Sequence, residues 1–81
     1  MIRTMAASDR NQVIFFKRFG VTVRKMREEA GLTLEDMQEY GFSPQHFQKI
    51  EAGKKFVNFY TVFRIAKAFN HSMGHLIEML D

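Results

Sequence analysis

The sequence contains no cysteine, which excludes a disulfide framework and a thiolate metal site. It also lacks an apolar run long enough to cross a membrane, and its N-terminus lacks the apolar stretch of a signal peptide. No segment of strand length alternates polar and apolar residues, and no internal repeat or low-complexity segment is present. These absences predict a helical protein that works in the reducing cytoplasm and has no membrane partner.

The motifs of an enzyme are missing as well. No Ser/His/Asp arrangement and no glycine-rich phosphate loop is recognisable, and 81 residues leave little room for a substrate cleft. His71 and His75 are four residues apart, a spacing that can bind metal on a continuous helix, but Ser72 is a natural helix cap between them. We therefore expect no catalytic residue, no cofactor and no metal site, and the sequence indicates no small-molecule effector.

The sequence does contain enough apolar material for one packed core. Hydrophobic residues make up 46% of the chain, and nine residues are Phe. Their three- and four-residue spacing, with candidate caps at Asn58 and Ser72, predicts an all-α domain over residues 11–81. Residues 1–10 have no clear period, and we interpret them as an N-terminal tail and a candidate for disorder. The five predicted helices cover residues 12–30, 34–40, 43–50, 58–69 and 72–80.

Two of these helices carry apolar stripes that predict their buried faces. In the first, Gly20 lies within the pattern and leaves open a break in the helix, because Gly costs roughly 1 kcal/mol of helix stability against Ala. The predicted buried residues of the first helix are Phe16, Phe19, Val23, Met26 and Ala30. Those of the fourth helix are Phe59, Val62, Phe63, Ala66 and Phe69.

The segment from Gly41 to Gly53 is the one around which the domain is organised. Gly41 tolerates a left-handed turn, Ser43 is a natural N-cap, and Gly53 suits the end of a helix. Phe47 and Ile50 lie three residues apart and share the inner face. The polar residues away from that face are Gln45, His46, Gln48 and Lys49. Their amide and cationic groups suit hydrogen bonding to base edges in the major groove of DNA.

A short helix precedes this segment. Thr33 and Asp36 have the spacing of a capping box, and Leu34 and Met37 are then expected to face inward. With the turn at Gly41, the two short helices form a helix-turn-helix unit. Helical hairpins are common, so this pattern alone is only a weak sign of DNA binding.

Charge is unevenly distributed along the chain, whose net charge is +3. Between Lys54 and His75 there are four cations and no acid, whereas acids gather in residues 28–39. The cations are Lys54, Lys55, Arg64 and Lys67, and the acids are Glu28, Glu29, Glu35, Asp36 and Glu39. One face of the domain is therefore expected to meet a polyanion and another to avoid it.

The motifs agree with one known family over most of the chain. They are Arg27, Gly31-Leu-Thr33, Gly41-Phe-Ser43, Ile50-Glu51-Ala-Gly53-Lys54, Ala66-Lys-Ala68 and Asn70-His-Ser72. This series, over about residues 23–80, resembles the Cro/cI-type (xenobiotic-response-element) helix-turn-helix family. The resemblance implies a compact, lambda-repressor-like domain of five helices, usually dimeric, that binds operator DNA and regulates transcription. In length the chain is similar to restriction–modification controller proteins and small phage-type repressors.

The resemblance also implies roles for single residues. The base-contacting candidates are Gln45, His46, Gln48 and Lys49, and the phosphate-contacting candidates are Ser43, Lys54 and Lys55. Arg27 and Glu51 match a structural ion pair that ties the first helix to the end of the third. Without the resemblance, the same residues would be interpreted as a solvated helix face, exposed lysines and separate surface charges.

One segment departs from the family pattern. Between Thr33 and Gly41 the chain is one residue shorter, with Met37 where the family has Leu and Gln38 where it has Ala. We expect the shortening to change the angle or the length of the second helix. Leu34 stands where relatives often have Gln, and it cannot hydrogen-bond a phosphate.

Two functions are compatible with these patterns. The first is a sequence-specific regulator of transcription that binds double-stranded DNA as a homodimer on a pseudo-palindromic operator. Its dimer interface is expected where apolar residues exceed one face of a short helix, at Tyr60, Ile77 and Met79. The alternative is a protein-interaction module, such as an antitoxin or adaptor, that uses the same fold. The apolar residues expected to be exposed for such a partner are Phe15, Phe56, Tyr60 and Met79.

Overall fold

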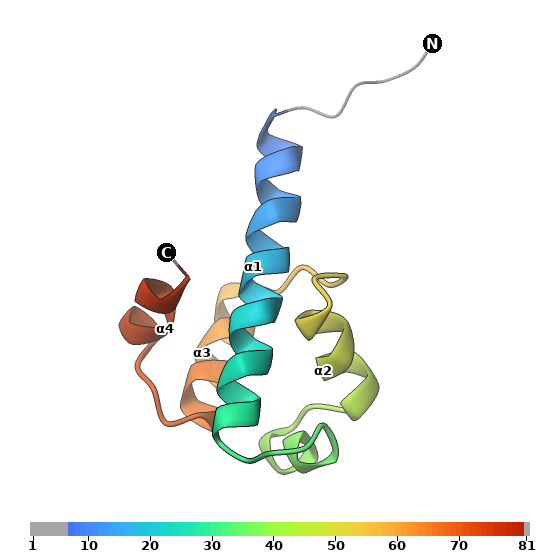
Figure 1. Cartoon of the computed structure of the whole chain (residues 1–81), viewed down its shortest axis with the longest axis vertical. Coiled ribbons are helices and arrows are strands. Elements are labelled where there is room, and N and C mark those ends of the chain that lie inside the picture. The colour runs from blue at the N-terminus through green and yellow to red at the C-terminus, as the bar shows by residue number, and fades with distance from the viewer. Residues whose placement is uncertain (1–6, 81) are drawn as a thin grey trace.

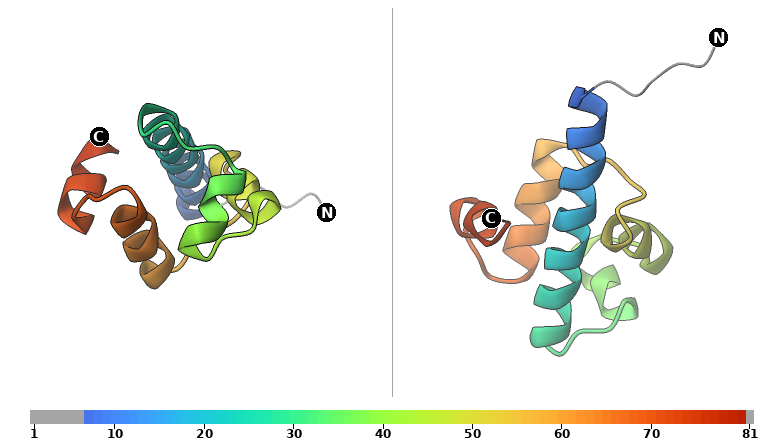
Figure 2. Two further views of the ribbon diagram at one scale, coloured as in Figure 1. Left: turned by 90° about the horizontal axis from the view of Figure 1, so that it is seen from below. Right: turned by 45° about the horizontal axis from the view of Figure 1, so that its top comes forward.

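The computed structural model describes residues 7–80, and every regular element in this range is a helix. α1 (Ala7–Glu29) runs through the middle of the domain (Figure 1). To one side lie η1 (Glu35–Tyr40, a 3-10 helix) and α2 (Pro44–Glu51). To the other lie α3 (Phe59–Ala68) and α4 (Met73–Met79), an arrangement that the turned views in Figure 2 also show. The predicted all-α fold of five helices is confirmed.

α1 is longer than its apolar stripe predicts. It begins at Ala7, so residues 7–10 of the predicted tail are helical, and residues 1–6 lie outside the described part of the chain. At about 1.5 Å per residue, its 23 residues span about 34 Å. The first turns of α1 project beyond the other helices (Figure 1). No helix in the described range is long and apolar enough to span a membrane.

The hydrophobic core is built on the inner face of α1. Phe19, Val23 and Met26 are buried, as their spacing predicts. Phe16 is only partly buried, and Ala30, just past the end of α1, is exposed. The other elements contribute Met37, Phe42, Phe47, Ile50, Ile65, Ala66, Phe69 and Leu76 to the core. Each fully buried large apolar side chain stabilises the fold by about 1.5–3 kcal/mol.

α1 continues through Gly20 without the break that the sequence left open. It is buried where α1 meets the last turn of α2, and a Cβ added there would lie 2.3 Å from the carbonyl oxygen of Glu51 and 2.6 Å from that of Ile50. The backbones of the two helices are therefore in direct contact, which only a residue without a side chain permits. The low helix propensity of Gly20 is offset by this contact.

α3 buries only part of the predicted stripe. Phe59 and Phe63 are 68% and 41% exposed, whereas Ile65, absent from the predicted stripe, is fully buried. The other three residues of the stripe lie in or against the core. Because α3 carries apolar side chains in nearly every direction, their spacing alone does not select the inner face. A row of aromatic side chains is left at the surface as a result.

The segment with one residue fewer than the family pattern forms a different type of helix. The predicted capping box is present, with the Thr33 N–H donating to Asp36 Oδ2 (2.8 Å) and the Asp36 N–H donating to Thr33 Oγ1 (3.1 Å). The helix that follows is a 3-10 helix of six residues, with Met37 buried. At about 2.0 Å per residue it spans roughly 12 Å, which an α-helix covers with about eight residues. The 3-10 geometry therefore gives these six residues a longer span than the same number would have in an α-helix.

Gly20→Ala should lower the free energy of unfolding by about 1–3 kcal/mol, the usual range for overpacking, although Ala is the better helix former. The atoms that the new methyl group would meet are backbone oxygens, so α1 and α2 must move apart. Urea unfolding followed by circular dichroism measures the change.

Gly74→Ala in α4 is the matched control, because the nearest atom to its added Cβ is Ser72 Oγ at 4.0 Å. This substitution should leave stability unchanged or raise it by up to about 1 kcal/mol. Equal effects of the two substitutions would show that the α1–α2 contact is not as close as described.

Candidate nucleic-acid interface

The start of α2 is fixed by a local hydrogen bond. Ser43 Oγ accepts from the backbone N–H of His46 (3.1 Å), so Ser43 is the N-cap, as predicted, and Pro44 takes the first helical position. The capping bond uses a lone pair of the Ser43 hydroxyl, and its O–H remains able to donate to another group.

The end of α2 is closed by a pair of backbone hydrogen bonds. The Gly53 N–H donates to the Ile50 carbonyl (3.0 Å), and the Lys54 N–H donates to the Lys49 carbonyl (2.9 Å). These two bonds form a Schellman motif, which requires a residue in the left-handed region just after the helix. Gly53 meets this requirement with a φ of +74°. The chain therefore leaves α2 sharply, as predicted, and Lys54 and Lys55 follow at once, both exposed.

The polar residues predicted to point outward divide by their position around α2. Phe47 and Ile50 are buried. At about 100° per residue, Gln45, Gln48 and Lys49 lie on the opposite side of α2 from these two, and all three are exposed. We call these three residues the outer face of α2. His46 is exposed too, but it lies towards the edge of the inner face, and its ring is 6.4 Å from that of Phe42.

Arg27 ties α1 to the last turn of α2. Its Nε donates to Glu51 Oε2 (2.6 Å), its Nη2 donates to Glu51 Oε1 (3.1 Å), and its Nη1 donates to the Leu32 carbonyl (2.8 Å). The side chains of the pair are 10% and 6% exposed. The hydrogen bond with Glu51 raises the pKa of Arg27 despite the opposing effect of burial, so Arg27 remains charged. The ion pair predicted between Arg27 and Glu51 is present.

Arg64 holds the turn between η1 and α2, a role that the sequence analysis did not find. Its Nη2 donates to the carbonyls of Tyr40 and Gly41 (both 3.1 Å), and its guanidinium lies 4.3 Å from the centre of the Phe42 ring. A Cβ at Gly41 would lie 2.5 Å from Nη2, so a glycine there also makes room for the arginine. No local signal could have identified this contact, because Arg64 is more than twenty residues from its partners.

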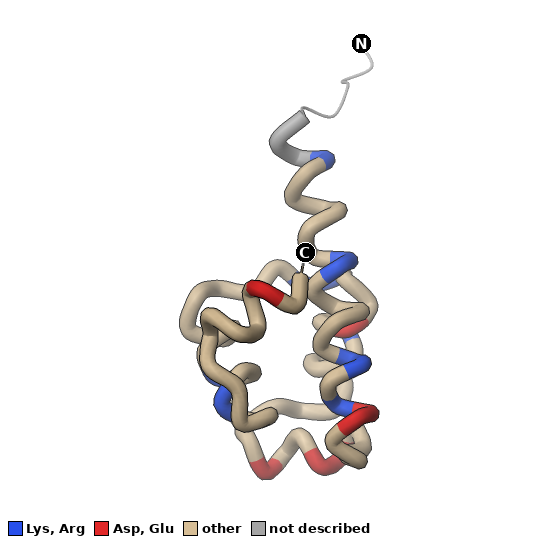
Figure 3. Tube along the Cα trace, turned by 60° about the vertical axis from the view of Figure 1, so that its left-hand side comes forward, with Lys and Arg blue, Asp and Glu red and all other residues tan. Residues whose placement is uncertain are grey.

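The charges near α2 are mainly cationic. No ion pair between described residues engages Lys49, Lys54 or Lys55. A surface pocket of about 230 Å³ at the end of the outer face is lined by Gln48, Lys49, Ala52 and Lys54. The acidic residues of η1 and of the end of α1 lie together at one end of the domain (Figure 3).

The two histidines that were considered as metal ligands lie side by side. The rings of His71 and His75 are stacked with centroids 4.7 Å apart, although Ser72 caps α4 between them. Within the described part of the chain, no group of three or more His, Cys, Asp or Glu residues is placed to hold a metal ion.

Comparison with known proteins agrees with this geometry. A family model described as a helix-turn-helix domain matches residues 18–78. The chain belongs to the helix-turn-helix family. The resemblance to its Cro/cI-type (xenobiotic-response-element) members is confirmed.

One solved structure supports the fold of this helix-turn-helix domain. The crystal structure of the clp gene regulator ClgR from Corynebacterium glutamicum matches it with a TM-score of 0.75. The match covers 82% of this chain and 71% of that chain at 22% sequence identity, a level at which the likeness concerns the fold alone. No curated protein sequence matches.

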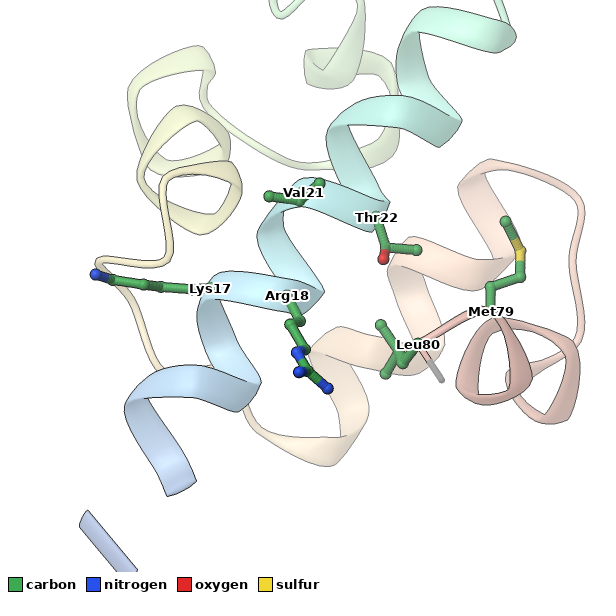
Figure 4. A pocket seen from close by; sticks show the side chains of 6 residues that line it. All are labelled: Lys17, Arg18, Val21, Thr22, Met79 and Leu80. Carbon is green, nitrogen blue, oxygen red and sulfur yellow. The ribbon is translucent and has the colours of Figure 1, made fainter. Parts of the chain in front are cut away.

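The residues predicted for the dimer interface of this helix-turn-helix domain do not share one surface. Ile77 lines an apolar groove of about 270 Å³ formed by α1, α3, α4 and the loop before α3. Met79 is partly buried and lines a different pocket, between α1 and α4, with Arg18 (Figure 4). Tyr60 is 67% exposed, and its ring stacks on that of Phe63. The groove residues are Phe15, Phe16, Val57, Phe59, Val62, Met73, Gly74 and Ile77.

Replacing Arg27 with Met should destabilise the domain by about 3–5 kcal/mol, because the Glu51 carboxylate would be left buried without its partner. Glu51→Met should have a similar effect by leaving the guanidinium unpaired. The double variant should recover much of the loss. Urea unfolding of the four proteins gives the coupling energy between the two residues.

The exposed pair Arg24–Glu28 offers a control cycle on the same helix, since its side chains are 64% and 54% exposed. Its coupling should not exceed about 0.5 kcal/mol. A coupling as small as this between Arg27 and Glu51 would contradict the buried pair.

Proposed function

We propose that this domain is a sequence-specific DNA-binding regulator of transcription that acts as a homodimer on a pseudo-palindromic operator. The observation that carries the proposal is the outer face of α2, where Gln45, Gln48 and Lys49 are exposed on a helix anchored at its inner face and closed at both ends. Base recognition requires free hydrogen-bonding groups on a rigid element, and α2 meets both requirements.

Gln45 and Lys49 are the proposed principal base-contacting residues. They lie one helical turn apart, near the middle of the outer face. A Gln side chain can pair with both hydrogen-bonding positions of adenine, and Lys can donate to guanine. Gln48 borders them and is positioned for a neighbouring base. His46 lies on the opposite border of the outer face, beside Phe42. We assign it a lesser role in base contact than Gln45 and Lys49.

Ser43, Lys54 and Lys55 are the proposed phosphate contacts. Ser43 lies at one end of α2 and the two lysines follow its other end, separated by roughly 12 Å of helix rise. The major groove is about 12 Å wide, so a helix inside it brings its two ends close to the sugar–phosphate backbones on either side. These contacts would set the register of the domain, while the outer face of α2 selects the sequence.

The proposed dimer uses the apolar groove. One α2 reads only a few base pairs, and two copies on half-sites about 34 Å apart would add the discrimination that one lacks. Large apolar side chains are exposed in or beside the groove, including Phe59, Phe63 and Ile77. Extended apolar patches on soluble domains mark interaction surfaces. The proposed interface therefore centres on Ile77. Tyr60, which stacks on Phe63 of α3, and Met79, which lines the neighbouring pocket, are proposed to lie at its edges.

The same groove favours a second candidate function, an interaction module such as an antitoxin or adaptor. Phe15 and Phe56 are 45% and 60% exposed, as that alternative expects. The two functions differ in their response to salt. Binding to DNA releases counterions and falls steeply as salt rises, whereas contact through an apolar groove changes little.

Selection from a random duplex library by the purified protein tests the proposed function directly. We expect enrichment of an inverted repeat whose half-sites are about one helical turn apart. Recovery of no sequence, together with salt-insensitive capture of a protein partner, would favour the interaction module instead.

Gln45→Ala should reduce binding to the selected duplex while leaving binding to a scrambled duplex nearly unchanged. One good base contact is worth about 1–3 kcal/mol of discrimination, and a dimer would lose it twice. Lys55→Ala should instead weaken binding to both duplexes and reduce the salt slope by about 1 per protomer. Competition binding across a salt series separates the two effects. If Gln45→Ala weakened both duplexes equally, Gln45 would not be a base-contacting residue.

Ile77→Asp should convert the dimer to a monomer, because it places a charge in the apolar groove. Sedimentation at micromolar concentration measures the mass, with and without operator DNA. Val21→Asp is the matched control, since Val21 is 67% exposed and lies outside the groove. A wild-type protein that is monomeric both free and on DNA would refute the proposed dimer.

A further inference from the structure

The loop after α2 crosses α1 at Lys17. A Cβ added to Gly53 would lie 2.9 Å from both the Cα and the Cγ of Lys17, so the two backbones are close to contact. Lys54 and Lys55 begin immediately after this crossing. The position of Lys17 relative to the two loop lysines is therefore set by the backbone.

The far end of the same loop is also held against α1. The ring of Phe56 stacks on that of Phe16, with centroids 4.9 Å apart and planes 24° from parallel. Phe16 precedes Lys17 in α1, so Lys54 and Lys55 lie between two contacts of the loop with the same turn of α1. This arrangement keeps the three lysines together at the end of α2.

The side chain of Lys17 is free to meet an anion. It is exposed, and no ion pair between described residues engages it. Among the side chains shown in Figure 4, Lys17 points away from Met79 and Leu80 and towards the loop that follows α2. Arg18, the next residue, points elsewhere, on the side of the pocket that Leu80 lines.

We propose that Lys17 is a further phosphate-contacting residue, which extends the anion-binding surface of Lys54 and Lys55 onto α1. The inference rests on the proposed DNA-binding function. A strand whose phosphates meet the two loop lysines passes the edge of α1, where the ammonium of Lys17 reaches the neighbouring phosphate. Sequence spacing could not reveal this residue, because Lys17 precedes the helix-turn-helix unit and joins the loop only in the folded domain.

Lys17→Gln tests the proposal on the full chain, with Arg18→Gln as the matched control that removes an equal charge one residue away. Affinity is measured for the selected duplex and a scrambled duplex between 50 and 200 mM salt. Lys17→Gln should weaken binding to both duplexes and reduce the salt slope by about 0.9 per protomer. The ratio of wild-type affinity to Lys17→Gln affinity should therefore be about threefold smaller per protomer at the higher salt concentration than at the lower one.

Arg18→Gln should leave the salt slope close to that of wild type, and Lys17→Arg should restore it. Circular dichroism and thermal unfolding check that each variant is folded. Equal slopes for Lys17→Gln and Arg18→Gln would overturn the assignment of Lys17 while leaving the proposed function intact. A wild-type protein that binds neither duplex would overturn both.

Discussion

The orientation of α2 depends on one residue, Glu51, which contacts α1 at two points two helical turns apart. Its carbonyl oxygen lies against Gly20, and its carboxylate pairs with Arg27. A buried ion pair adds little net stability compared with a well-packed apolar pair, because both charges lose their hydration. Its hydrogen bonds are directional, however, and all three engaged nitrogens of Arg27 have acceptors at 2.6–3.1 Å. The pair therefore serves mainly to set an angle, and the glycine sets the separation of the helices.

The start of α2 is held from the opposite side of the core. Arg64 of α3 binds the carbonyls of the turn and covers the ring of Phe42, which is itself buried against Phe47. One end of α2 is thus fixed by α1, and the turn before its other end is held by α3. Phe47 and Ile50 fix the inner face of α2 in the core. The polar side chains of α2 therefore lie on its opposite side, which faces solvent. A scaffold of this kind presents side chains to a ligand with little loss of conformational entropy on binding.

The features predicted correctly from the sequence are those whose cause is local. The caps at Ser43, Asn58 and Ser72 form as expected, because each accepts from the N–H three residues on. The exposure of the outer face of α2 follows from helical spacing alone. Features that depend on contacts across the core were missed. Two of the five residues predicted for the buried face of α3 are exposed, and Ile65 was left out of that face. The contacts of Arg64 and Lys17 are with segments distant in sequence, so no local pattern indicates them. The packing role of Gly20 was not foreseen for the same reason, since helix propensity takes no account of a neighbouring backbone.

The shortened segment before α2 shows how these constraints combine. A missing residue in η1 would rotate α2 if η1 determined its direction, and the outer face would then shift towards His46 or Gln48. η1 is a 3-10 helix, whose rise per residue is longer than that of an α-helix, and Met37 is buried in it. The contacts of Glu51 with α1 do not involve η1, whereas Arg64 donates to the carbonyl of Tyr40, the last residue of η1, as well as to that of Gly41. α2 is therefore held directly by α1 and η1, while α3 holds the turn before it, and Gln45 and Lys49 are exposed on the side of α2 away from the core.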